Sequence, residues 1–148
     1  METSKGYPGP IEEMPEGYEF PSIQKTVSFE KMKQFSGGLG PSQHTDLGFA
    51  KQFGHPTALA QGLMSHLYVT EVLTRAFGQA LLEGGKITSN FLKPVYAGDT
   101  LCIKGKLIRK RAGEGGTCLE IETRCENQRG ELVTAGTATL FAGTKVSR

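Results

Sequence analysis

The chain has 148 residues, 37% of them hydrophobic, and 17 basic against 15 acidic residues give a formal net charge of +2. This length and composition predict one compact domain that buries its own core without metals or disulfides. No basic face interleaved with aromatic residues is present, which argues against nucleic-acid binding. No apolar run approaches the roughly 20 residues that cross a bilayer, so a membrane span is not expected.

The cysteines and the N-terminal composition favour a cytoplasmic protein. Cys102, Cys118 and Cys125 lack Cys-x-x-Cys spacing and lie in expected strands, where cysteine usually fills apolar space. Residues 1–20 are rich in Pro, Gly and Glu and have no apolar signal-peptide centre. They are predicted to be a flexible lead-in to a single domain over residues 21–148.

The first half of the chain predicts a short strand followed by helices. Residues 21–27 suit a strand, and Ser28 is a preferred N-cap residue for a helix over 29–35 that paired glycines end. A second short helix is expected over 46–52. In residues 58–83 apolar side chains repeat every four positions, which predicts the longest helix. Its low charge favours a helix surrounded by other structure.

The second half of the chain predicts strands. In the third strand segment, apolar residues alternate with glutamate and arginine, as in a sheet with one buried and one solvated face. One long helix followed by antiparallel strands predicts an α+β fold in which the sheet curls around the helix. The expected strand segments are residues 86–95, 100–111, 116–127 and 131–143.

Three signatures carry a resemblance to a known family. They are FSGG, Pro and HTD within residues 35–46, followed by FAKQFGHPTALAQGL at 49–63; FLKPVYAGDTL at 91–101; and TAGTATLF at 134–141. From about Ser28 to Gly143 the chain resembles the MaoC-like (R)-specific hydratases and dehydratases. This resemblance implies the hotdog fold, an antiparallel sheet wrapped around a long central helix.

The chain departs from the family motif at polar positions near the chemistry. On this alignment Gly38 occupies the position of the catalytic aspartate, and Gly40 replaces an asparagine. One extra residue separates the motif's proline from His44. Gln61 replaces the histidine that normally precedes Gly62.

The resemblance implies that water adds across a double bond conjugated to a thioester carbonyl, or leaves to form one. This reaction needs a base, an acid and a site for the developing oxyanion. His44 is the implied general acid/base, and the Gly62 backbone N–H is the implied oxyanion donor. The implied substrate is an acyl thioester of coenzyme A or of an acyl-carrier protein.

Gly62 lies within the predicted long helix. Glycine inside a helix costs about 1 kcal/mol relative to alanine, so its presence needs a reason. Near a helix start, backbone N–H groups lack partners and the helix dipole is positive, which suits a substrate carbonyl. Tight packing of the helix against the sheet is the alternative reason.

Other polar residues are candidates for binding. The predicted substrate-binding residues are Ser42, Gln43, Asp46 and Gln61. Asp46 is also explained as a helix N-cap. No cofactor and no metal are expected, because His44, Asp46 and His55 show no recognised ligand spacing. His66 is interpreted as a core or interface histidine.

Several functions remain open at this point. A hydratase or dehydratase, hence a lyase, leads. An isomerase or cyclase that only shuttles a proton would tolerate the lost aspartate better. A non-catalytic hotdog subunit that supports an active partner fits the substitutions equally well. A thioesterase using Glu71 is a further alternative.

The resemblance and the sheet also predict partners. A curled sheet leaves an edge that a second copy can extend, so a homodimer or a higher hotdog oligomer is expected. A local excess of basic residues could lie at the entrance and meet the phosphates of coenzyme A or phosphopantetheine. This basic cluster consists of Lys104, Lys106, Arg109, Lys110 and Arg111.

Overall fold

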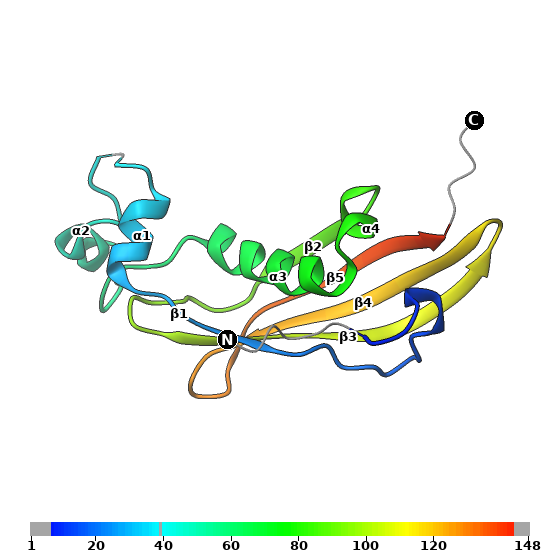
Figure 1. Cartoon of the computed structure of the whole chain (residues 1–148). Coiled ribbons are helices and arrows are strands. Elements are labelled where there is room, and N and C mark those ends of the chain that lie inside the picture. The colour runs from blue at the N-terminus through cyan, green and yellow to red at the C-terminus, as the bar shows by residue number, and fades with distance from the viewer. Residues whose placement is uncertain (1–6, 39, 144–148) are drawn as a thin grey trace.

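The computed structural model describes residues 7–38 and 40–143 (Figure 1). A single 3₁₀ turn, η1, covers Ile11–Glu13. The helices are α1 (Phe29–Phe35), α2 (Leu47–Gln52), α3 (Gly62–Phe77) and α4 (Gln79–Leu82). The strands are β1 (Ile23–Thr26), β2 (Lys86–Phe91), β3 (Thr100–Gly113), β4 (Gly116–Glu126) and β5 (Leu132–Gly143).

The five strands form one antiparallel sheet in the order β1-β3-β4-β5-β2, so that β1 and β2 are its edges. Helix α3 lies across one face of the sheet. Helices α1 and α2 lie beyond the N-terminal end of α3 (Figure 1). Alternate residues of β3 and β4 are buried, including Ile103, Leu107, Leu119 and Ile121. This arrangement confirms the predicted α+β class with one long helix over an antiparallel sheet.

The two short helices begin where the sequence predicts. The Ser28 side chain accepts a hydrogen bond from the Lys31 N–H at 3.2 Å, and Asp46 accepts one from the Phe49 N–H at 2.8 Å. Each cap satisfies a backbone donor that the first helical turn leaves free. Both helices therefore follow from local sequence.

Residues 7–20 lie against the sheet and its helix. Met14 and Phe20 are buried, and the Phe20 ring packs edge-on against Phe77 of α3 with centroids 5.3 Å apart. Glu19 forms an isolated bridge with Lys106 of β3. This part of the predicted lead-in is thus packed on the domain, and the boundary at residue 20 stays a prediction.

The long helix is shorter than predicted. Residues 58–60 are extended, because Ala60 N–H donates to Val95 O at 2.8 Å and Ala97 N–H donates to Ala58 O at 3.0 Å. The helix therefore begins only at Gly62. It ends at Phe77, and Gly78, with φ +50°, separates it from α4. The prediction of one continuous helix over 58–83 is wrong at both points.

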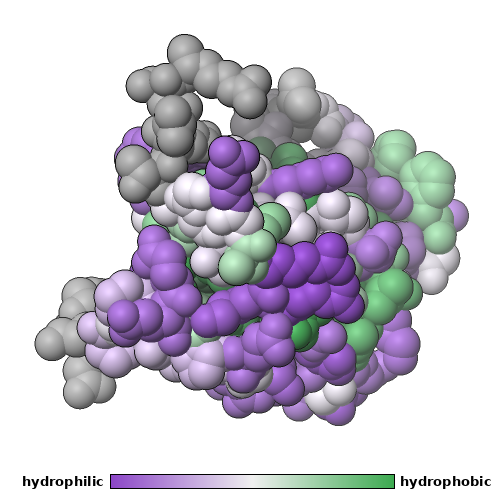
Figure 2. All heavy atoms as spheres, turned by 90° about the vertical axis from the view of Figure 1, so that its right-hand side faces the viewer, coloured by the Kyte–Doolittle hydropathy of each residue, from purple (hydrophilic) through white to green (hydrophobic). Residues whose placement is uncertain are grey.

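Helix α3 is also less enclosed than predicted. The sheet covers one side, where Met64, Val69 and Leu73 are buried, while Leu63 and Leu67 remain 53% and 45% exposed. At the other end of the molecule, on the right in Figure 1, Figure 2 shows hydrophobic residues gathered along one side of a mostly hydrophilic face. Within the described residues, no helix is long and apolar enough to cross a membrane.

The three cysteines occupy different environments. Cys125 is buried in the core, and desolvation of its thiol, followed by the nearby Cys102, raises its pKa to about 12. Cys102 is half-buried and Cys118 is exposed. The interpretation as an apolar filler therefore holds for Cys125 and is wrong for Cys118.

Candidate active site

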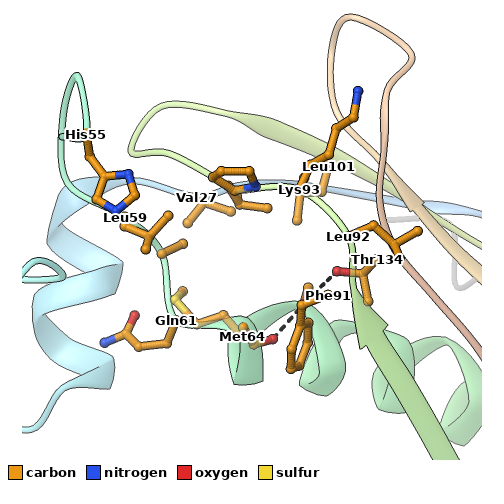
Figure 3. A pocket seen from close by; sticks show the side chains of 15 residues that line it. Val27, His55, Leu59, Gln61, Met64, Phe91, Leu92, Lys93, Leu101 and Thr134 are labelled. Atoms are coloured by element: carbon orange, nitrogen blue, oxygen red, sulfur yellow. Dashed lines mark hydrogen bonds between the residues drawn. The ribbon is translucent and has the colours of Figure 1, made fainter. Parts of the chain in front are cut away.

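A cavity of about 320 Å³ opens at the N-terminal end of α3 (Figure 3). His55, Leu59 and Gln61 lie along one side in this view, and Phe91, Leu92 and Thr134 along the other. The remaining lining residues are Val27, Ala60, Gly62, Met64, Ser65, Lys93, Pro94, Val95 and Leu101. The lining is largely apolar with a few polar groups, which is typical of a small-molecule site.

Gly62 is the first residue of α3 and lines the cavity. No described residue accepts a hydrogen bond from its N–H. Helix N-terminal amides carry partial positive charge, so this donor suits an oxygen that gains negative charge. A Cβ at this position would lie 2.9 Å from the Phe91 ring, so close packing also favours glycine here.

Gln61 precedes Gly62 and also lines the cavity. Its amide nitrogen donates to the Ser36 hydroxyl and, at 3.5 Å, to the Met32 carbonyl of α1. Its amide oxygen is buried and has no hydrogen-bond partner among the described residues. Gln61 and Gly62 are the two predicted site residues that the fold brings together in the cavity wall.

His44 lies behind that wall and does not line the cavity. Its Nδ1 is 2.6 Å from the carbonyl oxygen of Leu59, which is itself a lining residue. Because a carbonyl can only accept, Nδ1 carries a proton, and in the neutral form of the ring Nε2 is then the proton acceptor. No described residue hydrogen-bonds Nε2. His44 is therefore held in the tautomer that a general base needs.

The other predicted binding residues organise the loop that carries His44. The Ser42 hydroxyl accepts from the His44 N–H at 3.2 Å, and Asp46 caps α2. The Gln43 carbonyl accepts from the Leu59 N–H at 2.9 Å. Ser42, Gln43 and Asp46 do not line the cavity. Their contacts position the loop, and direct substrate binding by them stays a prediction.

Sequence reasoning missed a buried hydroxyl pair in the cavity wall. Ser65 Oγ donates to the Gly62 carbonyl at 2.9 Å and lies 2.9 Å from Thr134 Oγ1 of β5. Since Ser65 has one proton, Thr134 donates to it. Hydroxyl residues on buried faces of a helix and a strand were the available signal, but nothing in the sequence pairs the two elements.

His55 and Lys93 also line the cavity. His55 Nδ1 lies 3.3 Å from the Tyr96 hydroxyl, and Lys93 forms an ion pair with Glu131 at 2.9 Å. Among the described residues, no group of three or more His, Cys, Asp or Glu could hold a metal ion.

The basic cluster does not lie at this cavity, so its predicted place at the entrance is wrong. None of its members lines the cavity. Lys104 pairs with Glu126 at 2.8 Å, and Arg109 approaches Glu120 at 3.9 Å. The cluster follows β3 away from its cavity end at about 3.3 Å per residue. Two of its five members thus take part in ion pairs with β4, and Lys110 Nζ donates to the Glu12 carbonyl at 3.0 Å.

Glu71 does not support the thioesterase alternative. It does not line the cavity. Its carboxylate is held by Lys25 at 2.8 Å and by Arg75 at 2.6 Å. The hydrogen bond from Lys25, with the charges of Lys25 and Arg75, lowers the Glu71 pKa. A paired carboxylate of lowered pKa, away from the cavity, is a poor base for chemistry there.

Comparison with known proteins places the chain in a family. The MaoC like domain family matches residues 22–128. The chain belongs to this family. A UPF0336 protein of Streptomyces coelicolor is 26% identical over 131 residues, which cover 79% of this chain and 85% of that protein.

Two solved structures illustrate what this MaoC-like domain is similar to. The R-hydratase PhaJ1 from Pseudomonas aeruginosa superposes with a TM-score of 0.72 at 20% identity, covering 94% of this chain and 92% of that chain. The HadBC 3R-hydroxyacyl-ACP dehydratase complex from Mycobacterium tuberculosis gives 0.68 at 18%, covering 88% and 99%. At these identities the likeness shows the fold, and it confirms the predicted hotdog architecture.

Proposed function

We propose that this MaoC-like domain adds water to, or removes water from, an acyl thioester of coenzyme A or of an acyl-carrier protein. The observation that carries the proposal is the unpartnered Gly62 N–H at the start of α3, in the wall of a largely apolar cavity. A thioester carbonyl bound there would be polarised where negative charge develops. The relatives named R-hydratase and 3R-hydroxyacyl-ACP dehydratase support this choice of reaction.

His44 is the proposed acid/base. In hydration its Nε2 takes a proton from water, the resulting hydroxide adds to C3, and the double-bond electrons move onto the thioester oxygen at the Gly62 N–H. The imidazolium then returns the proton to C2. Because His44 contacts the wall through Leu59, a bridging water completes this proton path.

The test is hydration of trans-2-butenoyl-coenzyme A by the purified wild type, followed by the loss of absorbance of the conjugated thioester. We expect turnover above the buffer rate, with the 3-hydroxyacyl product found by mass spectrometry. Bound thioester without turnover contradicts the hydratase assignment. It would leave isomerisation or cyclisation in the same cavity, or a subunit that supports an active partner.

The supporting-subunit alternative rests on Gly38, which on the motif alignment occupies the position of the family's catalytic aspartate. This residue has φ +75°, and a Cβ placed on it meets no atom within 4 Å. Aspartate is among the residues that best tolerate such backbone. Turnover by Gly38→Asp in an otherwise silent protein would favour this alternative. A Gly38→Asp protein that stays silent would speak against it.

We further propose that the chain forms a homodimer through the β2 edge. β2 lies at one end of the sheet, and Phe91 and Leu92 beside the cavity are 56% and 53% exposed. The exposed Leu63 and Leu67 of α3 extend this apolar surface. The related dehydratase named above is a complex, which supports association.

Sedimentation velocity tests this dimer. We expect the wild type to sediment as a dimer. The double variant Leu63→Lys, Leu67→Lys should shift toward monomer, because burying charged lysines in the dimer interface costs desolvation free energy. A wild type that remains monomeric at micromolar concentration contradicts the proposal.

A further inference from the structure

Two buried hydroxyl groups join the first turn of α3 to the sheet. Thr134 Oγ1 of β5 donates to Ser65 Oγ at 2.9 Å, drawn in Figure 3 as a dashed line that starts at Thr134. Ser65 Oγ in turn donates to the Gly62 carbonyl at 2.9 Å. Among the described residues, the Ser65–Thr134 bond is the only hydrogen bond between residues 62–65 and a strand of the sheet. Two hydrogen bonds in series therefore connect β5 to Gly62.

Gly62 has little local restraint of its own. Gln61, the N-cap residue of α3, makes no side-chain hydrogen bond to the helix end. Glycine has more backbone freedom than any other residue, and the ends of helices open at little cost in free energy. The N–H and the carbonyl of Gly62 flank the same Cα atom, so a bond that holds the carbonyl also limits the rotations that would redirect the N–H.

A second contact reaches Gly62 from the same place in the sheet. Phe91 of β2 is the register partner of Thr134 on β5. The Phe91 ring packs so closely on Gly62 that an added Cβ would lie 2.9 Å from it. One residue pair of the sheet thus holds Gly62 twice, through the Phe91 ring and through Ser65. All four residues line the cavity.

We propose that the Ser65–Thr134 hydroxyl pair holds the Gly62 N–H in the direction that the developing oxyanion requires. This inference rests on the proposed function and adds two positioning residues to it. A donor that is fixed in place before the reaction stabilises transition-state charge best, because nothing has to reorganise when the charge appears. The pair acts through Gly62 and transfers no proton to the substrate.

The alternative role of the pair is purely structural, since buried hydroxyl groups need partners in any core. Two variants of one residue separate the roles. Thr134→Val keeps the branched shape and removes the hydroxyl, whereas Thr134→Ser keeps the hydroxyl and removes a buried methyl group. If the pair positions Gly62, kcat follows the hydroxyl. If it adds only stability, the folded Thr134→Val protein keeps the wild-type kcat.

Steady-state hydration of trans-2-butenoyl-coenzyme A tests the inference, with Tm measured on every variant. We expect Thr134→Val to lower kcat about 2- to 10-fold, the range of one net hydrogen bond, with little change in KM. This loss is smaller than the roughly 100- to 1,000-fold loss that follows removal of an oxyanion donor. Thr134→Ser should recover most of the lost kcat, although the missing methyl group lowers its Tm.

Thr123→Val is the matched control. Thr123 of β4 is 2% exposed, as Thr134 is, and its hydroxyl has no hydrogen-bond partner among the described residues. It does not line the cavity. This variant should keep the wild-type kcat, and its Tm should equal or exceed that of the wild type, because an unsatisfied buried hydroxyl is removed.

Ser65→Ala, alone and combined with Thr134→Val, checks that the two hydroxyls act in series. The double variant should lose no more kcat than the slower single variant, because either change breaks the same connection. Wild-type kcat in both folded single variants overturns this inference alone, as does a Thr134→Ser protein as slow as Thr134→Val. A wild type without turnover overturns it together with the proposed function.

Discussion

Replacing His44 by alanine lowers kcat for hydration of trans-2-butenoyl-coenzyme A by about 100- to 10,000-fold, the usual contribution of one positioned acid or base. The expected loss is large because, on the proposed mechanism, His44 performs both proton transfers. Its Nδ1–H is already committed to the Leu59 carbonyl, so Nε2 is the nitrogen available for chemistry. Steady-state kinetics at neutral pH measure the change.

His66→Ala is the matched control for His44→Ala. His66 lies on α3, bonds the Ser89 hydroxyl through Nδ1 at 2.8 Å, and does not line the cavity. It should keep kcat within a few-fold of the wild type. Equal losses in the two variants, or a His44→Ala enzyme with wild-type kcat, would remove His44 from the mechanism.

Gly136→Ala destabilises the fold by about 1–3 kcal/mol, the range for forced overpacking. Gly136 pairs with Ser89 where β5 meets β2, and an added Cβ would collide with the carbonyl oxygen of Thr88. That oxygen belongs to the backbone, so the clash is relieved only by moving β2 off the sheet. Thermal unfolding should show Tm lowered by roughly 3–12 °C.

Gly40→Ala serves as the control for Gly136→Ala. A Cβ at Gly40 meets no atom within 4 Å, so we expect Tm close to that of the wild type. Because β2 also carries Phe91 to the cavity and forms the proposed dimer edge, Gly136→Ala should weaken dimerisation too. A Gly136→Ala protein with wild-type Tm would mean that β2 does not pack on β5 as described.

The features predicted correctly from sequence depend on neighbouring residues. Ser28 and Asp46 cap helices because a short side-chain oxygen can reach an amide three residues on. Alternation along β4 predicts its buried face because successive side chains of a strand point to opposite sides. The paired glycines after α1 end that helix, and both have positive φ.

The errors arise where distant segments compete for the same groups. Periodicity extended the long helix back to residue 58, but residues 58–60 bond to Val95 and Ala97 instead. The basic cluster was placed by resemblance near the entrance, although cross-strand carboxylates on β4 pair with it. A local sequence pattern does not identify either of these distant partner segments.

The sequence by itself determined the family and the α+β class, and it identified His44, Gln61 and Gly62 as candidate site residues from their places in the motif. These inferences depend on motif and on local backbone chemistry. Only the tertiary structure decided which of them share a cavity, since its walls come from segments as far apart as Val27 and Thr134. It also decided that the Gln61 amide nitrogen donates to the Met32 carbonyl of α1, while the amide oxygen has no hydrogen-bond partner among the described residues. Hydrogen bonds between distant segments determine which polar atoms remain free for a ligand, and sequence periodicity carries no record of them.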